Sequence, residues 1–288
     1  MSTTIESIIL EATHPAEFSS GVAGATLLNL TLNDFSTPLQ HLKKDHSVFV
    51  ASRGNDAYVI KTRPVFSTYQ IPDSVRNEII INRKLSGDDR FVKFHGYFFD
   101  EYNDELCLCL VFDFLAKART LDQCVSLTLK TKESLFNDLI HIVKHLHSMN
   151  IVHRDIKPRN ILVHNNKVYL IDFGLSTFGD KSSTRAGTLP FMAPELYTTS
   201  TKNFDRSVDI WACGITLWYL ISGNIPFINN QKETIKQTLC NVAAASVEAE
   251  SDDHLINFVN YDKILKSDSV AIKIKNMLKP NSSERKFA

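Results

Sequence analysis

The chain has 288 residues, of which 43% are hydrophobic and 22% charged, a composition typical of a globular protein with room for two domains. Lys and Arg number 32, as do Asp and Glu, so the net charge is zero. A neutral chain lacks the broad positive field that binds nucleic acid or anionic membranes, and we expect neither as a direct partner. The five cysteines form no CxxC pair, which favours reduced, mostly buried thiols in an intracellular protein. Cys107 and Cys109 alternate in an apolar run and should share one face of a strand.

The first part of the chain carries only weak patterns. Residues 1–37 hold one short apolar run, IIL, between Glu6 and Glu11, which is too short for a signal peptide. We expect this segment to be an extension that packs on the domain after it. The longest apolar stretch, residues 210–221, is shorter than the ~20 residues that cross a bilayer, and it predicts a buried helix.

Residues 38–112 are predicted to form mainly strands. VFVAS and AYVIK are typical of two strands joined by the SRGND turn, and LCLCLVF is typical of a buried strand. One helix interrupts them. Asp73 is a candidate N-cap and Gly87 a candidate stop, so we expect the helix over 74–86.

The remainder of the chain is predicted to be mainly helical. Two short strands, NILVH and KVYLID, flank a turn at Asn165–Asn166. Apolar residues at helical spacing predict helices at 133–149 and near 206–222, with weaker ones near 230–240 and 268–278. A strand-rich part followed by a helical part predicts an α+β protein with two lobes.

The stretch HRDIKPRNILVHNNKVYLIDFG, residues 153–174, carries the strongest motif. It matches HRDxKxxN at all five fixed positions, then DFG at 172–174, and APE follows at 193–195. The sequence thereby resembles the eukaryotic-type protein kinase family over roughly residues 38–287. The resemblance implies the bilobal kinase fold, with an N-lobe at 38–112, a hinge at 113–115 and a C-lobe at 116–288.

The resemblance also implies how phosphoryl transfer would proceed. Asp155 would accept the proton of the attacking hydroxyl, and Lys157 would neutralise the transferring phosphate. Asn160 and Asp172 would hold Mg²⁺, with Mn²⁺ as an alternative ion, through the hard oxygen ligands that Mg²⁺ prefers. Thr188 would hydrogen-bond with Asp155 and Lys157.

Two further charged residues fall where the family binds ATP. Lys61, in YVIK, matches the strand lysine that contacts the α- and β-phosphates. Glu78 lies 17 residues later on the predicted helix and should pair with it.

The adenine pocket is likewise inferred from the resemblance. Phe112 would close its rear, and the backbone of Asp113 through Leu115 would face the adenine. Val48, Val59 and Leu162 would sandwich the ring.

The loop before Val48 departs from the family. His41, Lys43 and His46 stand where the family has glycines, whose backbone amides approach the phosphates. Lys43, Lys44 and His46 place positive charge at the same tip. We therefore expect side-chain cations to replace part of the missing amide contacts.

The segment between the DFG and APE motifs resembles the serine/threonine branch. Gly187-Thr188 before LPFMAPE and Lys157 carry this resemblance. Thr184 stands where many members hold an activating phosphate, which Arg154 could bind. Other basic partners common in the family are absent, so we expect this phosphate to be helpful rather than obligatory.

Glu195 and Arg285 are expected to form a buried pair that joins segments distant in sequence. The chain stops three residues after Arg285, so we expect a C-lobe without the family's usual last helix.

Several alternatives stay open at this point. The glycine-free loop suits a pseudokinase scaffold, and a small-molecule kinase of related fold is a third class. His141 and His145 have a metal-ligand spacing but favour ordinary helix packing. The acidic run at 248–253 is either a solvated loop or a docking patch for basic protein substrates. The Ile79–Ile81 run indicates ordinary packing or a homodimer through 74–86.

The compact size also resembles, more narrowly, the late protein kinases of baculoviruses. That resemblance implies basic or viral protein substrates, and an intracellular location in the cytoplasm or nucleus of a host cell.

Overall fold

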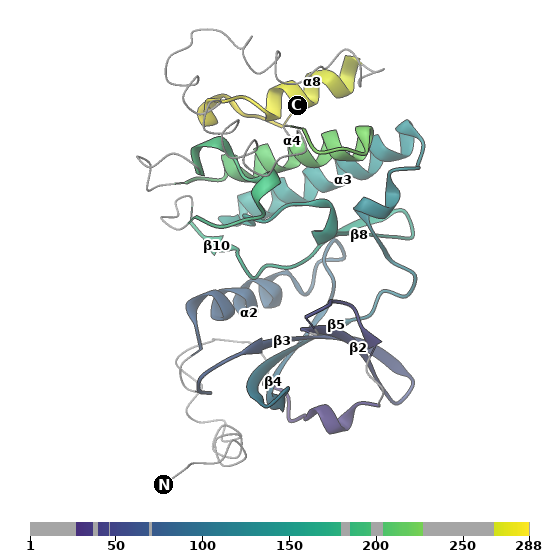
Figure 1. Cartoon of the computed structure of the whole chain (residues 1–288), viewed down its shortest axis with the longest axis vertical. Helices are drawn as coiled ribbons and strands as arrows, with labels where there is room; N and C mark the ends of the chain where they lie inside the picture. Colours follow the sequence, from purple (N-terminus) through teal and green to yellow (C-terminus); the bar gives the residue numbers. More distant parts are fainter. Residues whose placement is uncertain are drawn as a thin grey trace. The chain divides into compact units, whose positions relative to one another are not determined.

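The computed structural model describes residues 27–36, 40–45, 47–68, 71–179, 185–196, 204–226 and 268–287. The chain divides into two compact units, residues 1–116 and residues 117–288. The first contains a five-stranded sheet and one helix, and the second is mainly helical (Figure 1), which confirms the expected α+β division. The predictions for His46, Thr184, most of 1–37, the helix near 230–240 and the acidic run at 248–253 lie outside the described residues.

The sheet of the first unit is antiparallel, with strand order β1-β2-β3-β5-β4. Its strands are β1 Gln40–His41, β2 Val48–Arg53, β3 Asp56–Pro64, β4 Phe94–Tyr102 and β5 Glu105–Asp113. The three strands predicted from VFVAS, AYVIK and LCLCLVF are confirmed as parts of β2, β3 and β5. The sequence predicts mainly strands over 38–112 but assigns none to residues 94–102. A β-bulge between Phe94 and Gly96 interrupts the alternation at the start of β4.

The two faces of the sheet bury different residues. Cys107 and Cys109 lie on one face with Phe49 and Phe98, as the alternation predicts. Burial raises the pKa of Cys107 to about 11 and that of Cys109 well above its ordinary value, so both thiols stay protonated at neutral pH. All four described cysteines are free and buried.

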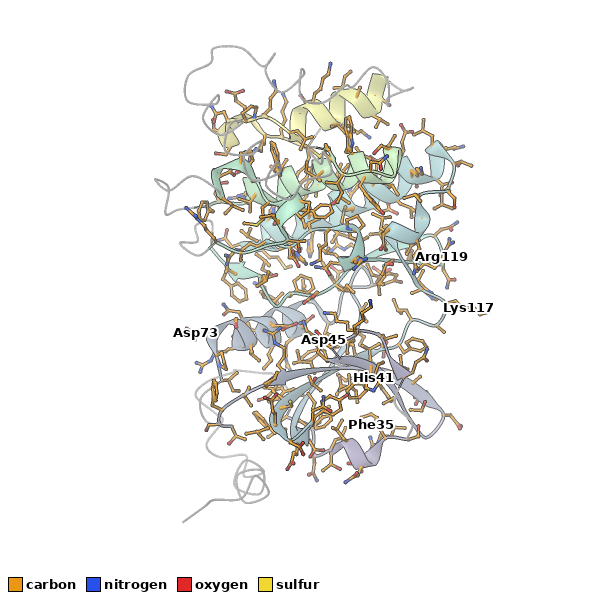
Figure 2. All side chains as sticks on the ribbon, viewed as in Figure 1. Phe35, His41, Asp45, Asp73, Lys117 and Arg119 are labelled. Carbon is orange, nitrogen blue, oxygen red and sulfur yellow. The ribbon has the colours of Figure 1, made fainter. Side chains whose placement is uncertain are left out.

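Helix α2, Asp73–Leu85, packs on the opposite face of the sheet. It starts and ends one residue earlier than predicted, and Figure 2 shows Asp73 at its start. The expectation that Asp73 caps the helix is wrong: Pro72 is the N-cap, and Asp73 already belongs to the first turn, where the helix dipole favours its carboxylate. Ile79 and Ile81 are buried and Ile80 is half-buried, so none of the three isoleucines is exposed.

The described end of the N-terminal segment runs against the edge strand β4. Leu27 forms a parallel bridge with Tyr97, and the Leu28 N–H donates to the Tyr97 carbonyl at 2.8 Å. The Leu32 N–H donates to an Asp100 carboxylate oxygen at 2.6 Å. Phe35 then stacks on Phe98 with ring centroids 6.1 Å apart. This segment thus covers part of the edge of the sheet.

Three α-helices lie in the described part of the second unit. Helix α3, Leu129–Ser148, and helix α8, Asp268–Met277, both contact the apolar helix α4, Ser207–Ser222 (Figure 1). Helix α3 begins four residues before the predicted 133–149, because Thr128 caps it by accepting from the Thr131 N–H. No helix in the described part of the chain is long and apolar enough to cross a membrane.

Short strands connect these helices to the loops of the second unit. They are β6 Arg119–Thr120, β7 Ile151–Val152, β8 Ile161–His164, β9 Lys167–Leu170 and β10 Thr177–Phe178. Asn165 and Asn166 both have positive φ, 49° and 60°, as a tight two-residue hairpin requires. The predicted β8–β9 hairpin is therefore confirmed, with each strand slightly shorter than its motif.

Candidate active site

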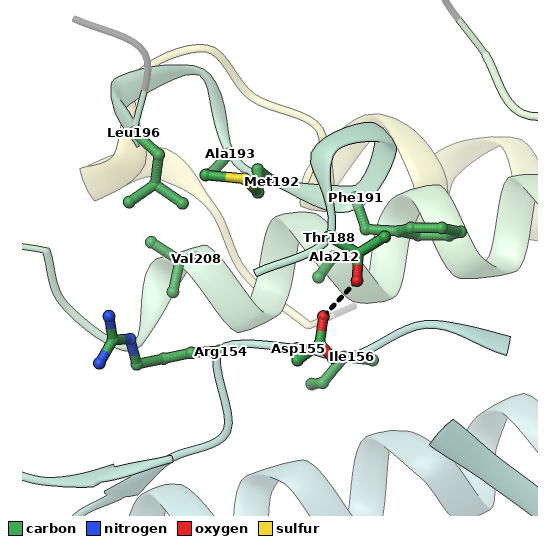
Figure 3. Close-up of a pocket in the computed structure, with 10 residues that line it drawn as sticks. All are labelled: Arg154, Asp155, Ile156, Thr188, Phe191, Met192, Ala193, Leu196, Val208 and Ala212. Atoms are coloured by element: carbon green, nitrogen blue, oxygen red, sulfur yellow. Dashed lines mark hydrogen bonds between the residues drawn. The ribbon is translucent and has the colours of Figure 1, made fainter. Parts of the chain in front are cut away.

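The HRD segment places a buried carboxylate at the centre of a hydrogen-bond network. Asp155 Oδ1 accepts from the Thr188 hydroxyl at 2.7 Å (Figure 3). Its Oδ2 accepts from Lys157 Nζ at 2.7 Å and from Asn160 Nδ2 at 2.9 Å. Lys157 Nζ also donates to the Thr188 hydroxyl at 2.6 Å. The expected contacts among Thr188, Asp155 and Lys157 are therefore present.

Asp209, at the start of α4, holds the backbone of this loop. Its two carboxylate oxygens accept from the N–H groups of His153 and Arg154, each at 2.8 Å. Arg154 has a φ of 69°, which is costly for a residue other than glycine and is maintained only where the surroundings fix it. His147 Nε2 lies 2.9 Å from Asp209 Oδ2. Burial alone would raise the pKa of the Asp209 carboxyl, but the His147 and backbone hydrogen bonds outweigh it and lower that pKa.

Sequence reasoning missed Asp209 and His147. Asp209 is fully buried, which is rare for a carboxylate without partners, and its partners His147, His153 and Arg154 all lie far away in the sequence. The one available signal is its place in the first turn of an otherwise apolar helix, where an acidic residue has no role in packing.

His153 connects the catalytic loop to the DFG segment within the same unit. Its Nδ1 accepts from the Asp155 N–H at 3.2 Å, and its Nε2 lies 3.2 Å from the Ile171 carbonyl. This arrangement suits a neutral ring that carries its proton on Nε2. Burial lowers the pKa of His153, in agreement with a neutral ring. The Phe173 ring packs against it at 5.1 Å.

Asn160 and Asp172 lie at the two ends of the β8–β9 hairpin. The Ile171 N–H donates to the Asn160 carbonyl at 2.9 Å, which ties the ends together. Asn160 donates to Asp155 twice, and both hydrogen bonds come from its Nδ2, so its Oδ1 is not used in them. An amide oxygen and a carboxylate, carried at the two joined ends of one hairpin, are hard oxygen ligands of the kind that fits Mg²⁺. By contrast, no group of three or more His, Cys, Asp or Glu side chains within the described residues could hold a metal, so His141 and His145 have no third ligand there.

The first unit contains the expected ion pair. Lys61 Nζ lies 2.5 Å from Glu78 Oε1, and both residues are buried. Arg63 Nη1 lies 4.0 Å from the other carboxylate oxygen, too far for a hydrogen bond. Lys61 is thus the cation that holds Glu78, and α2 is joined to β3 through this contact.

The sheet register places the expected pocket residues on one face. Val48 pairs with Lys61, and Val59 pairs with Phe112. Because Val59 and Lys61 are two residues apart on β3, all four side chains lie on the same face. Leu115 is half-buried just after β5. Leu162 is half-buried on β8 of the second unit, and its predicted place in the adenine sandwich stays a prediction.

The described part of the glycine-free loop adopts backbone angles that residues other than glycine readily adopt. None of residues 40–45 has a positive φ. An Asp45 carboxylate oxygen accepts from the Ser47 N–H at 3.0 Å and from its hydroxyl at 2.7 Å, which shapes the turn. These bonds and nearby Lys43 lower the pKa of Asp45. Lys43 and Lys44 are exposed, and Figure 2 labels His41 and Asp45 on either side of them along the chain.

The segment that carries Thr188 approaches Arg154 closely. Gly187 has a φ of 125°, and a side chain there would meet the Arg154 carbonyl oxygen at 2.8 Å. Arg154 itself lines a small hollow with Met192, Leu196 and Val208 (Figure 3), and burial lowers its pKa. The placement of Arg154 relative to Thr184 stays a prediction.

Comparison with known proteins agrees with this geometry. Residues 47–288 match the protein kinase domain. Serine/threonine-protein kinase PEPKR2 of Arabidopsis thaliana is 33% identical over 177 residues, 59% of this chain and 36% of that protein. The gamma catalytic chain of phosphorylase b kinase, liver/testis isoform, of Mus musculus is 34% identical over 169 residues, 55% of this chain and 41% of that protein.

The fold and site therefore define a protein of the kinase class, and the chain belongs to the protein kinase family. It spans between a third and a half of the length of the curated relatives named above.

Proposed function

We propose that this protein is a serine/threonine protein kinase that transfers the γ-phosphoryl group of ATP, with a divalent metal, to protein hydroxyls. The single observation that carries the proposal is the Thr188–Asp155–Lys157 network. The buried Asp155 carboxylate accepts from Lys157 and from Thr188, each at 2.7 Å, and Lys157 donates to Thr188 at 2.6 Å. The names of the relatives support serine and threonine as the acceptors.

Each residue of the network has a role in this reaction. Asp155 orients the attacking hydroxyl and accepts its proton, and Lys157 neutralises charge on the transferring phosphate. Thr188 fixes Asp155 by donating to Oδ1. In the other unit, Glu78 positions Lys61 for the α- and β-phosphates. Asn160 and Asp172 would hold the metal, which supplies charge neutralisation at the phosphates; we propose Mg²⁺, with Mn²⁺ as the alternative.

One assay tests the proposal against the other two classes. The full chain is incubated with labelled ATP, Mg²⁺, a mixture of casein and histones, and a protein-free metabolite extract, and the labelled products are identified by mass spectrometry. We expect phosphoserine and phosphothreonine. Label only in a small metabolite would favour a small-molecule kinase. An absence of transfer to any acceptor, with both Mg²⁺ and Mn²⁺, would favour a scaffold.

The loop lysines provide a further prediction. We expect Lys43→Ala/Lys44→Ala to raise the KM for ATP about three- to tenfold, because each lost surface cation weakens phosphate binding by up to ~1 kcal/mol. The effect should shrink at high salt, which screens exposed charges. Lys130→Ala, an exposed lysine on α3, is the control. An unchanged KM in the double variant would contradict the idea.

Regulation through Thr184 is also a proposal. We expect Thr184→Ala to lower activity several-fold without abolishing it, because Arg154 is the one basic partner expected for a phosphate there. Steady-state rates of phosphorylated wild type, phosphatase-treated wild type and the variant provide the measurement. A folded variant with essentially no activity would show instead that phosphorylation is obligatory.

The finer proposals concern partners and location. Basic protein substrates are supported by the acidic run at 248–253, and a preference for histone over casein in the assay would bear this out. A second copy bound through 74–86 has no exposed isoleucine to support it, and light scattering at assay concentration tests it. A host-cell location, in cytoplasm or nucleus, is testable with an epitope-tagged chain.

A further inference from the structure

A β-bulge changes the direction of one histidine in β4. Phe94 pairs with Phe112, and Gly96 pairs with the neighbouring residue Val111. His95 is therefore an extra residue in β4 that has no register partner of its own in β5. Phe94 packs on Phe112, with ring centroids 5.2 Å apart. The contacts of His95 with Tyr58 and Asp113 place it on the other face of the sheet from the Phe94–Phe112 pair, because Tyr58 and Asp113 alternate with Val59 and Phe112 along β3 and β5.

On that face His95 contacts two side chains from two different strands. Its Nε2 lies 2.5 Å from Asp113 Oδ1, at the end of β5. The Tyr58 ring of β3 meets the imidazole edge-on, with centroids 5.3 Å apart. Tyr58 and Asp113 are register partners, so the three side chains form one cluster across β4, β5 and β3.

Asp113 stands at a functionally important position. It directly follows Phe112 and opens the 113–115 segment whose backbone is expected to face adenine. Its own N–H donates to the Lys93 carbonyl at 3.0 Å, the last backbone contact between this end of β5 and the chain entering β4. Its carboxylate is held by His95 from the face opposite to Phe112, so His95 can fix the strand end without contacting the adenine pocket.

We propose that His95 is a positioning residue for the adenine-binding end of β5: the bulge aims its imidazole at Asp113, and this contact holds the 113–115 backbone ready for the nucleotide. The inference rests on the proposed kinase function. Adenine is bound equally in the ground state and in the transition state, so losing this contact should raise the KM for ATP and leave kcat unchanged. A contact that served folding alone would change neither parameter in the folded protein.

The test uses three variants of the full chain. We expect His95→Ala to raise both the KM for ATP and the Kd for a fluorescent ATP analogue about three- to fivefold, the size expected for one half-exposed polar side-chain contact, with kcat unchanged. His95→Gln, whose amide N–H can reach Asp113, should restore most of the affinity. His141→Ala, an exposed histidine on α3, should have no effect. Thermal melting shows whether each variant is folded.

Each outcome separates this inference from the proposed function. A wild type that transfers phosphate and a folded His95→Ala variant with unchanged KM and Kd would overturn the inference alone. A lower kcat at unchanged KM, or no rescue by His95→Gln, would overturn it as well. If the wild type bound ATP but transferred no phosphate, and His95→Ala bound ATP more weakly, the kinase function would be overturned and the role of His95 supported. A wild type that binds no nucleotide would overturn both.

Discussion

Replacing Asp155 by Asn should lower the rate of phosphoryl transfer by about 10²- to 10⁴-fold, the contribution typical of a positioned general base. The asparagine has the same shape and can still accept from Thr188, but it cannot take the proton of the attacking hydroxyl. It also places an amide N–H where Lys157 and Asn160 now donate, so both of those bonds to the side chain are lost. The fold should survive, because the side chain keeps its size.

The measurement is transfer of label from Mg·ATP to the mixed protein substrate, with nucleotide affinity determined separately by calorimetry. We expect the ATP Kd to change less than threefold, because the affected groups act on the transferring phosphate and the hydroxyl. Asp138→Asn, an exposed acidic residue on α3, is the matched control and should behave as wild type. If Asp155→Asn kept more than a tenth of the wild-type rate, the proposed role of Asp155 would be wrong.

Replacing Arg285 by Ala should lower the free energy of unfolding of the second unit by about 3–5 kcal/mol. The guanidinium is fully buried and donates to both Glu195 oxygens, at 2.6 and 2.7 Å. It also donates to three backbone carbonyls, of Lys279, Pro280 and Ser207, and lies 5.0 Å from the Trp211 ring. Its removal leaves a carboxylate and several carbonyls without these donors.

The two tryptophans of the chain, Trp211 and Trp218, both lie in α4, so their fluorescence during denaturant unfolding reports on this unit. Arg285→Lys should lose part of the stability, since an ammonium cannot bind both carboxylate oxygens in parallel. Lys286→Ala, exposed and adjacent, is the control. Glu195→Ala/Arg285→Ala should cost less than the sum of the single changes. Additive losses, or a loss under 1 kcal/mol in Arg285→Ala, would contradict the pair's role.

Much of the site followed from sequence because short motifs fix local geometry. HRDxKxxN and DFG flank a hairpin whose turn residues, Asn165 and Asn166, determine its length, and so Asn160 and Asp172 were placed at its two ends. The Lys61–Glu78 contact could be predicted because both residues stand where the resemblance to the kinase family places a strand lysine and its glutamate partner.

Other features had no local signal. Asp209 reaches back 55 and 56 residues to the N–H groups of Arg154 and His153, and nothing in α4's own pattern indicates that partner. The bulge at His95 breaks the period of 2, so pattern reasoning could neither name β4 nor orient the histidine. The helix start at Asp73 was misplaced for a similar reason, since capping depends on the backbone angles of Pro72 rather than on residue type alone.

The sequence by itself determined the family, the division into a strand-rich and a helical part, and the residue types that serve phosphoryl transfer, because these depend on spacing along the chain. Only the tertiary structure decided which further groups hold them in place: Asp209 binds the backbone of the catalytic loop, the Arg285 guanidinium also binds three backbone carbonyls, and His95 contacts Asp113. Those contacts join residues far apart in sequence, or depend on a one-residue bulge, and their energies come from burial and hydrogen-bond geometry that no local pattern records.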